Sequence, residues 1–203
     1  MKPQDYQLSK EEIEQIMDKE GETRGVAIKS HADFVVKEKG EEGLKKIEER
    51  MQELGQPIDF KKISKMKFYP IGLEIITLLA IKEVFGFDEE KIKEMGSFES
   101  KTSLLVRIFM KYFVSIKEAA SQVSVMWKKN YTKGDLKVVD LNQEEQYVKL
   151  ELKDFSFHPI HCLTLEGYFS SVVKMIVNSE KITCKETKCI HRGDESHEFL
   201  VQW

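Results

Sequence analysis

The spacing of apolar residues changes once along this chain, near residues 132–135. Before that point apolar side chains recur every three or four positions, as in 41–54, where Leu44 and Ile47 share one helical face. After it, residues 147–152 alternate apolar and polar side chains, which is the pattern of a strand with one buried face. The chain is therefore expected to form helices first and a sheet afterwards.

Six helices are predicted in the first part of the chain. Ser9 caps the first, from Glu11 to about Glu20, and Pro70 opens an apolar helix that runs to Phe85. The remaining four are expected at 30–36, 41–54, 88–95 and 100–131.

The second part predicts a sheet interrupted by one helix. Strands are expected at 136–141, 147–152, 181–190 and 197–203, with a helix at 163–178. This order predicts an α+β fold, in which a helical N-terminal half packs on a roughly four-stranded antiparallel sheet with a C-terminal hairpin. Residues 1–203 are interpreted as a single domain, with a helical part at 1–131 and a sheet and metal-site part at 132–203.

Charge and hydropathy exclude several classes of partner. The formal net charge is -3, which argues against a nucleic-acid partner. The first residues are polar, and the longest apolar run, 71–81, is too short to span a membrane. The three cysteines cannot all pair within one chain. A cytoplasmic location is the expectation.

Four possible metal ligands lie in the last part of the chain, in the pattern C-x23-E-x2-C-x7-H. They are Cys162, Glu186, Cys189 and His197. Thiolate, carboxylate and imidazole together suit zinc in a closed, four-ligand structural site. The pattern predicts that zinc fixes the final hairpin to the preceding helix.

This site requires an irregular strand, because residues 186 and 189 point to opposite faces of a regular one. Cys184, His191 and His161 are alternative ligands. A further alternative without metal stays open, in which the two cysteines are simply buried apolar side chains.

Residues 182–199 resemble the closing motif of the 4-vinyl reductase-type domain. That motif is E-x2-C, a Gly-Asp turn and a final cysteine before an aromatic strand; here Glu186 and Cys189 match it, and His197 replaces the final cysteine. Cys162 matches the upstream cysteine of the family. The resemblance implies the fold shared by haem-NO-binding domains and TRAPP vesicle-tethering subunits, with zinc beside a hydrophobic effector pocket.

The sequence argues against haem as a cofactor. The haem-binding branch of this fold uses a Tyr-x-Ser-x-Arg motif, and residues 168–172 lack its arginine. That branch also uses a histidine in a mid-chain helix, and no histidine lies between His31 and His158.

Large apolar side chains are concentrated in the predicted helices at 100–131 and 163–178. The resemblance implies a pocket between these helices and the sheet, and aromatic residues with a polar group are its best candidates. The predicted pocket residues are Phe113, Trp127, Tyr168, Phe109 and Phe169. The alternative is that these residues are ordinary core.

These observations favour a non-catalytic binding or sensor domain for a small hydrophobic or aromatic molecule, with structural zinc. No catalytic residue is predicted, since the sequence shows no nucleophile–base arrangement and no nicotinamide or flavin fingerprint. Two alternatives remain: a reductase-like accessory enzyme of tetrapyrrole or hydrocarbon metabolism, or a dimeric protein-interaction subunit. A sensor of this size is expected to signal to a separate partner protein, and a homodimer is one arrangement.

Overall fold

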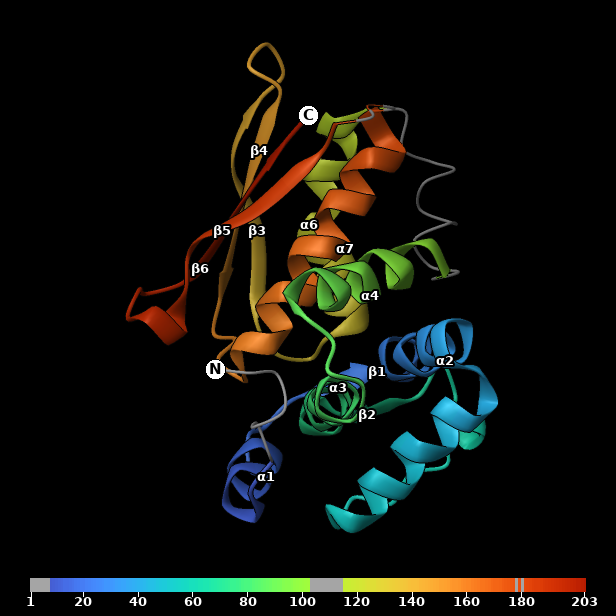
Figure 1. Ribbon diagram of the computed structural model, residues 1–203. Helices are drawn as coiled ribbons and strands as arrows, with labels where there is room; N and C mark the ends of the chain where they lie inside the picture. Colours follow the sequence, from blue (N-terminus) through green and yellow to red (C-terminus); the bar gives the residue numbers. More distant parts are fainter. Residues whose placement is uncertain (1–7, 103–114, 178, 180) are drawn as a thin grey trace.

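The computed structural model describes residues 8–102, 115–177, 179 and 181–203, and it has an α+β fold (Figure 1). Helices α1 (Lys10–Met17), α2 (Gly25–Glu53) and α3 (Ile71–Phe85) lie together at the bottom of the view. A four-stranded antiparallel sheet and its covering helices lie above them. The predicted fold class is confirmed.

The ends of α1 and α3 follow the predicted signals. The Ser9 hydroxyl accepts a hydrogen bond from the Glu12 backbone N–H at 3.1 Å, which caps α1. Helix α3 starts directly after Pro70 and ends at Gly86, whose φ of 63° lies in the left-handed region. Its side chains are buried nearly all round, so α3 is the central helix of the lower layer.

Helix α2 starts earlier than predicted and joins two predicted helices. Gly40, with φ 71° and ψ -177°, kinks it where the sequence predicts a break. Its early start is set by tertiary contacts, because the Arg24 side chain donates to the backbone carbonyls of Met66 and Lys129. The spacing of apolar residues over a few positions cannot reveal such contacts, so the sequence did not predict where α2 begins.

A single helix over 100–131 is wrong. Helix α4 (Glu89–Thr102) runs past its predicted end and already includes Ser100. Helix α6 (Ile116–Asn130) begins separately, because Ser115 is extended, with φ -147° and ψ 156°. The Ser115 hydroxyl caps α6 by accepting from the Glu118 N–H at 3.3 Å.

A two-stranded ribbon joins the lower layer to the end of α6. Strands β1 (Glu22–Arg24) and β2 (Phe68–Pro70) pair antiparallel, and the 3-10 turn η1 (Phe60–Lys62) precedes β2. Each strand has three residues, too few for a detectable alternation. Thr23 also forms a β-bridge with Tyr131. The ribbon therefore holds the backbone at Tyr131.

The sheet follows the order β3-β4-β6-β5, with every neighbouring pair antiparallel. The strands are β3 (Asp135–Asn142), β4 (Tyr147–Lys153), β5 (Thr183–Lys188) and β6 (His197–Gln202). Val148, Leu150 and Leu152 are buried, while the alternate residues of β4 are more exposed. One face of the sheet is therefore packed, as the alternation predicts.

Helix α7 (Pro159–Val177) lies with α6 against the packed face of the sheet (Figure 1). By length and composition α7 could span a membrane. However, 56% of its apolar window is buried within the protein, which is the environment of a core helix.

Two glycines bring α7 and α4 into backbone contact. A Cβ atom at Gly96 would collide with the Thr164 carbonyl, and one at Gly167 would collide with the Lys93 carbonyl. Larger side chains at either position would force the helices apart.

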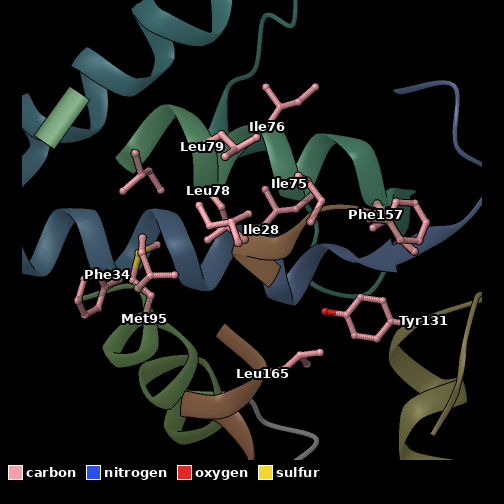
Figure 2. Close-up of a cluster of buried hydrophobic side chains, with 14 of the residues drawn as sticks. Ile28, Phe34, Ile75, Ile76, Leu78, Leu79, Met95, Tyr131, Phe157 and Leu165 are labelled. Atoms are coloured by element: carbon pink, nitrogen blue, oxygen red, sulfur yellow. The ribbon is translucent and has the colours of Figure 1, made fainter. Parts of the chain in front are cut away.

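The largest part of the core lies between α2, α3 and α4. Figure 2 shows Ile28, Ile75 and Leu78 between α2 and α3, and Phe34 beside Met95 where α2 meets α4. In the same view the Tyr131 hydroxyl points into the interior.

Candidate functional site

The four predicted metal ligands converge in the structure. One donor atom from each of Cys162, Glu186, Cys189 and His197 lies within 4.8 Å of the others, and all four residues are buried. We call these four residues the thiol cluster. The Cys162 Sγ lies 4.0 Å from the Cys189 Sγ and 3.6 Å from the His197 Nδ1. The sulfur atoms are thus too far apart for a disulfide but close enough to share one ion.

A strand irregularity brings Glu186 and Cys189 together, as the sequence requires. Glu186 pairs with Phe199 and Lys188 with Glu198, so Thr187 is an extra residue in β5. Helix α7 supplies Cys162 from its first turn, and Glu166 on the same helix accepts a hydrogen bond from the Glu186 N–H at 2.7 Å. This contact fixes β5 against α7.

The hydrogen bonds of His197 orient its ring for ligation. Its Nε2 lies 2.8 Å from the Phe155 carbonyl oxygen, which accepts only, so Nε2 carries a proton. Its Nδ1 lies 2.8 Å from the Glu186 Oε1. If Nε2 carries the only ring proton, then the His197 Nδ1 and the Glu186 Oε1 are both acceptors. Their short contact requires a second proton between them or a metal ion bound to both. A backbone carbonyl behind the ring is also the usual second partner of a metal-bound histidine.

The turn after β5 is hydrogen-bonded around Cys189. The Cys189 N–H donates to the Asp194 carboxylate at 2.8 Å, and the Cys189 carbonyl accepts from the Arg192 N–H at 2.8 Å. The short helix η2 (Ile190–Arg192) ends at Gly193, whose φ is 96°. The Gly-Asp turn therefore positions the Cys189 thiol.

Burial raises the pKa of Cys162, Glu186 and Cys189, and hydrogen bonds reverse its effect only at Glu186. Burial, with the nearby Glu186, raises the pKa of the Cys162 thiol well above its usual value, and burial also raises the pKa of Cys189. Burial raises the pKa of Glu186 as well, but hydrogen bonds from His197, Cys162 and Cys189 outweigh it, and the net pKa is lowered. A bound cation would favour both thiolates.

The three alternative ligands lie elsewhere. His161 turns toward a second cluster described below, and its Nε2 lies 3.1 Å from the Glu74 Oε1. His191 is exposed, with its ring 5.6 Å from that of His197. Cys184 pairs with Val201 in the sheet, and its thiol is outside the described four-residue group.

An apolar cavity of about 100 Å³ lies between α6, α7 and the inner face of the sheet. Three of the predicted pocket residues, Trp127, Tyr168 and Phe169, contribute to its wall. The other two, Phe109 and Phe113, lie outside the described residues. Other described residues of the wall are mostly aliphatic: Ile116, Ala119, Val123, Leu136, Leu150, Leu165 and Val173.

One end of the cavity is polar. Its polar groups come from Glu99 of α4, His161 of α7, Asn130 at the end of α6 and Tyr131 directly after α6. Trp127 stacks on Tyr131 with ring centroids 4.4 Å apart, and its Nε1 donates to the Lys133 carbonyl at 2.9 Å. Trp127 of the apolar wall and Tyr131 at the polar end of the cavity are therefore in direct ring contact.

Behind this polar end lies a buried group of ionisable residues that the sequence did not predict as a site. Its members are His31, Glu74, Glu99, Tyr131 and His161, and we call them the imidazole–carboxylate cluster. The Tyr131 hydroxyl donates to the Glu74 Oε1 at 3.1 Å. His31 and Glu74 have no exposed surface. The sequence contained one signal of this cluster: Glu74 is the one charged residue in the apolar run 71–81.

Burial alone would raise the pKa of both carboxyls in this cluster. The pKa of Glu99 is raised to about 7 by burial and by the Glu74 charge, although His31 opposes the shift. The pKa of Glu74 is lowered, because His161 and His31 together outweigh the effect of burial. Glu74 is therefore ionised, with a positive or hydrogen-bond-donating neighbour on the Oε1 side.

Comparisons with solved structures identify the fold. A crystal structure of an H-NOX protein from S. oneidensis in the Fe(II)NO ligation state has a TM-score of 0.66 and 14% identity, covering 88% of this chain and 98% of that one. A triple mutant of an H-NOX protein from S. oneidensis, in the Fe(II) ligation state, has a TM-score of 0.68 and 13% identity. The match covers 88% of this chain and 95% of that one. A structure concerned with heme redox potential and protein-induced porphyrin distortion has a TM-score of 0.56 and 14% identity. The match covers 89% of this chain and 99% of that one.

This chain has the H-NOX fold. At these identities the likeness concerns the fold alone. No protein family matches the sequence, and no curated protein matches it significantly.

The prediction about cofactors is wrong. The sequence argued against haem and for zinc, but structures of this fold include Fe(II) proteins and one concerned with heme, while none of the three comparisons above supports zinc. The physical reason is that the missing arginine of one motif and the missing mid-chain histidine exclude one way of holding haem. They do not exclude the cofactor from the fold.

The described cavity residues match a haem site in part. His161 provides an imidazole, and its buried Nδ1 has no hydrogen-bond partner among the described residues. Haem also carries two carboxylates, and the described wall includes neither arginine nor lysine to pair with them. Haem, if bound, would supply gas-binding chemistry at its iron, and His161 is the described residue whose imidazole would hold it.

Proposed function

We propose that this chain is a non-catalytic sensor domain of the 4-vinyl reductase type that binds a single-ring aromatic molecule in its apolar cavity. The cavity with one polar end is the observation that supports this most directly. Pockets for drug-sized ligands have volumes of roughly 300–1,000 Å³, whereas an engineered cavity of about 150 Å³ binds benzene. A volume of about 100 Å³ therefore favours one ring.

The polar end selects the substituent on that ring. Asn130, Tyr131 and His161 offer hydrogen-bonding groups there, and the opposite wall is aliphatic. A phenol directs its hydroxyl to this end and buries its ring against Trp127 and Phe169. An unsubstituted hydrocarbon of the same size leaves these polar groups unpaired, and binds more weakly.

Tryptophan fluorescence tests this proposal. Trp203→Phe leaves Trp127 as the remaining tryptophan, so phenol and catechol titrations report on the cavity wall. Val123→Phe fills the cavity and is expected to weaken phenol binding at least about tenfold. Val139→Phe is the matched control, because Val139 is 49% exposed and lies outside the described wall.

Several outcomes would contradict the proposal. Equal phenol affinity in both variants would place the ligand elsewhere. Binding of haem or another tetrapyrrole without phenol binding would replace the single ring by a macrocycle. No thermal shift with phenols, fatty acids or tetrapyrroles would remove the ligand function.

The thiol cluster is proposed to bind a divalent metal ion. Its support is the close approach of His197 and Glu186, with both cysteine thiols within reach of the same point. Elemental analysis of the purified protein identifies the ion, and Co²⁺ substitution gives a thiolate charge-transfer band if the cysteines coordinate. Cys189→Ser is expected to abolish that band, whereas Cys184→Ser, the matched control, should retain it.

In this proposal the domain works in the cytoplasm and transmits ligand binding to a separate protein or to a second copy of itself. Helix α7 contributes to the cavity and to the thiol cluster, so a ligand that moves it changes both. Sedimentation with and without phenol measures the dimer, and an unchanged monomer in both conditions would exclude it.

A further inference from the structure

We infer that the imidazole–carboxylate cluster is a second metal site, which binds a divalent ion of the Mn²⁺ or Fe²⁺ class through His31, Glu74 and Glu99. One donor atom from each of these residues lies within 4.8 Å of the other two. An ion about 2.1 Å from each ligand requires donors within roughly 4.3 Å, so small side-chain shifts complete the site.

The unpaired atoms of the interior are concentrated at this cluster. Among the described residues, the buried side-chain atoms without a hydrogen-bond partner include both ring nitrogens of His31, the Glu74 Oε2, the His161 Nδ1 and the Thr23 Oγ1. The His31 Nε2 lies 3.6 Å from the Glu74 Oε1, which is longer than a hydrogen bond. Unpaired buried polar atoms are costly, and an ion is one of the groups that satisfies them.

The two oxygens of Glu74 have different surroundings. Its Oε1 lies 3.1 Å from both the Tyr131 hydroxyl and the His161 Nε2, so this oxygen is held by outer partners. Its Oε2 is among the unpaired atoms. Outer hydrogen bonds that orient a carboxylate are typical of metal ligands. Oε2 is therefore the oxygen assigned to the ion.

The donor set determines the class of metal. Two carboxylates and one imidazole provide hard oxygen donors and a nitrogen, which suit Mn²⁺ and Fe²⁺, whereas thiols favour softer ions. Two carboxylate charges also balance one divalent cation in the protein interior. Glu99 lies on the cavity wall, so the proposed ion site borders the cavity.

Mn²⁺ binding to the full chain tests this inference independently of the proposed function. After chelator treatment, calorimetric and paramagnetic-resonance titrations are expected to show one Mn²⁺ bound per chain. Glu74→Gln and His31→Gln should each weaken binding by at least about tenfold. Glu83→Gln is the matched control: it lies on the same helix but pairs with Arg50, and it should bind as the wild type does.

Two results would overturn the inference. The first is no Mn²⁺ or Fe²⁺ binding by the folded wild type, which would assign the unpaired atoms to water. The second is equal binding in Glu74→Gln and Glu83→Gln. If Glu74→Gln does not fold by circular dichroism, His31→Gln and the wild type still decide. Phenol titration reports on the cavity, and the Co²⁺–thiolate band reports on the thiol cluster. Failure of either test is therefore distinguishable from failure of Mn²⁺ binding.

Discussion

The thiol cluster and the imidazole–carboxylate cluster each take one member from the first turn of α7. His161 enters one of them and Cys162 the other. In the thiol cluster, Glu186 and His197 contact each other at 2.8 Å, and an exposed Arg192 reaches the Glu186 Oε2 at 3.2 Å. In the imidazole–carboxylate cluster, Glu74 is fully buried and one of its oxygens has no partner among the described residues.

This difference shows two ways of placing charge in an interior. The thiol cluster lies beside the edge strand β5, where the exposed Arg192 pairs with Glu186. The imidazole–carboxylate cluster lies where α2, α3, α4 and α7 meet, and it depends on its own members for compensation. Loss of one member should therefore be far more costly in the second cluster than in the first.

The largest expected effect is that of Glu74→Ala. It removes the carboxylate that compensates two buried imidazoles, and is expected to lower the free energy of unfolding by about 3–5 kcal/mol. Urea denaturation followed by circular dichroism measures this. Glu49→Ala, which breaks an exposed pair with Lys45, should cost less than about 1 kcal/mol. Equal small losses in the two variants would show that Glu74 carries no compensated charge.

Gly167→Ala tests the backbone contact between α4 and α7, the helix that contributes to both clusters. Its new Cβ would meet the Lys93 carbonyl, so we expect a loss of about 3 kcal/mol as α7 separates from α4. Ser170→Ala on the same helix adds no atom and should cost less than about 1 kcal/mol. Thermal unfolding compares the two. Wild-type stability in Gly167→Ala would mean that the helices are not in backbone contact.

His158→Asn tests the start of α7 through pH. The His158 Nδ1 accepts a hydrogen bond from the Ile160 N–H at 3.0 Å, so His158 caps the helix directly before His161 and Cys162. Burial lowers the pKa of His158 from 6.5 to about 4, and nearby cations add to this while Glu12 opposes it. The unfolded chain therefore binds a proton below about pH 6.5 that the folded chain does not bind until about pH 4. Stability from this group is present above that window and is lost as the pH falls through it.

The variant should remove this loss and keep the cap, because asparagine is a favourable N-cap residue. The His158 side chain is 23% exposed, so we expect a difference of about 1–2 kcal/mol between wild type and variant at pH 4 relative to pH 7. Urea midpoints at both pH values measure it. Parallel pH curves would show that His158 does not titrate with folding.

The smallest expected effect is that of Arg192→Gln. The Arg192 side chain is 55% exposed, so its ion pair with Glu186 should contribute less than about 1 kcal/mol and weaken further in high salt. Chemical denaturation at low and high ionic strength measures this. A loss as large as that of Glu74→Ala would remove the difference between the clusters.

The sequence predicted the sheet and the thiol cluster well because their determinants are local. Strict alternation at 147–152 and the caps at Ser9 and Gly86 each act over a few residues. Glu186, Cys189 and His197 lie within twelve positions, and a hairpin necessarily brings such positions together. Even the irregularity at Thr187 followed from the requirement that Glu186 and Cys189 share one side.

The imidazole–carboxylate cluster could not be predicted in this way. Its members are spread from His31 to His161, and no short spacing connects them. Only the packing of α2, α3, α4 and α7 brings the side chains together, and that packing depends on contacts such as Gly96 against Thr164. The break before α6 was missed for a related reason, because apolar spacing continues past Ser115 while the backbone does not.

His161 and Cys162 are consecutive in the chain, and their side chains diverge by about 100° around the helix axis. Because one helical turn carries both residues, a displacement of that turn would move the outer partner of Glu74 and a thiol of the other cluster together. If the two clusters influence each other through it, thermodynamic reciprocity requires the influence to be equal in both directions.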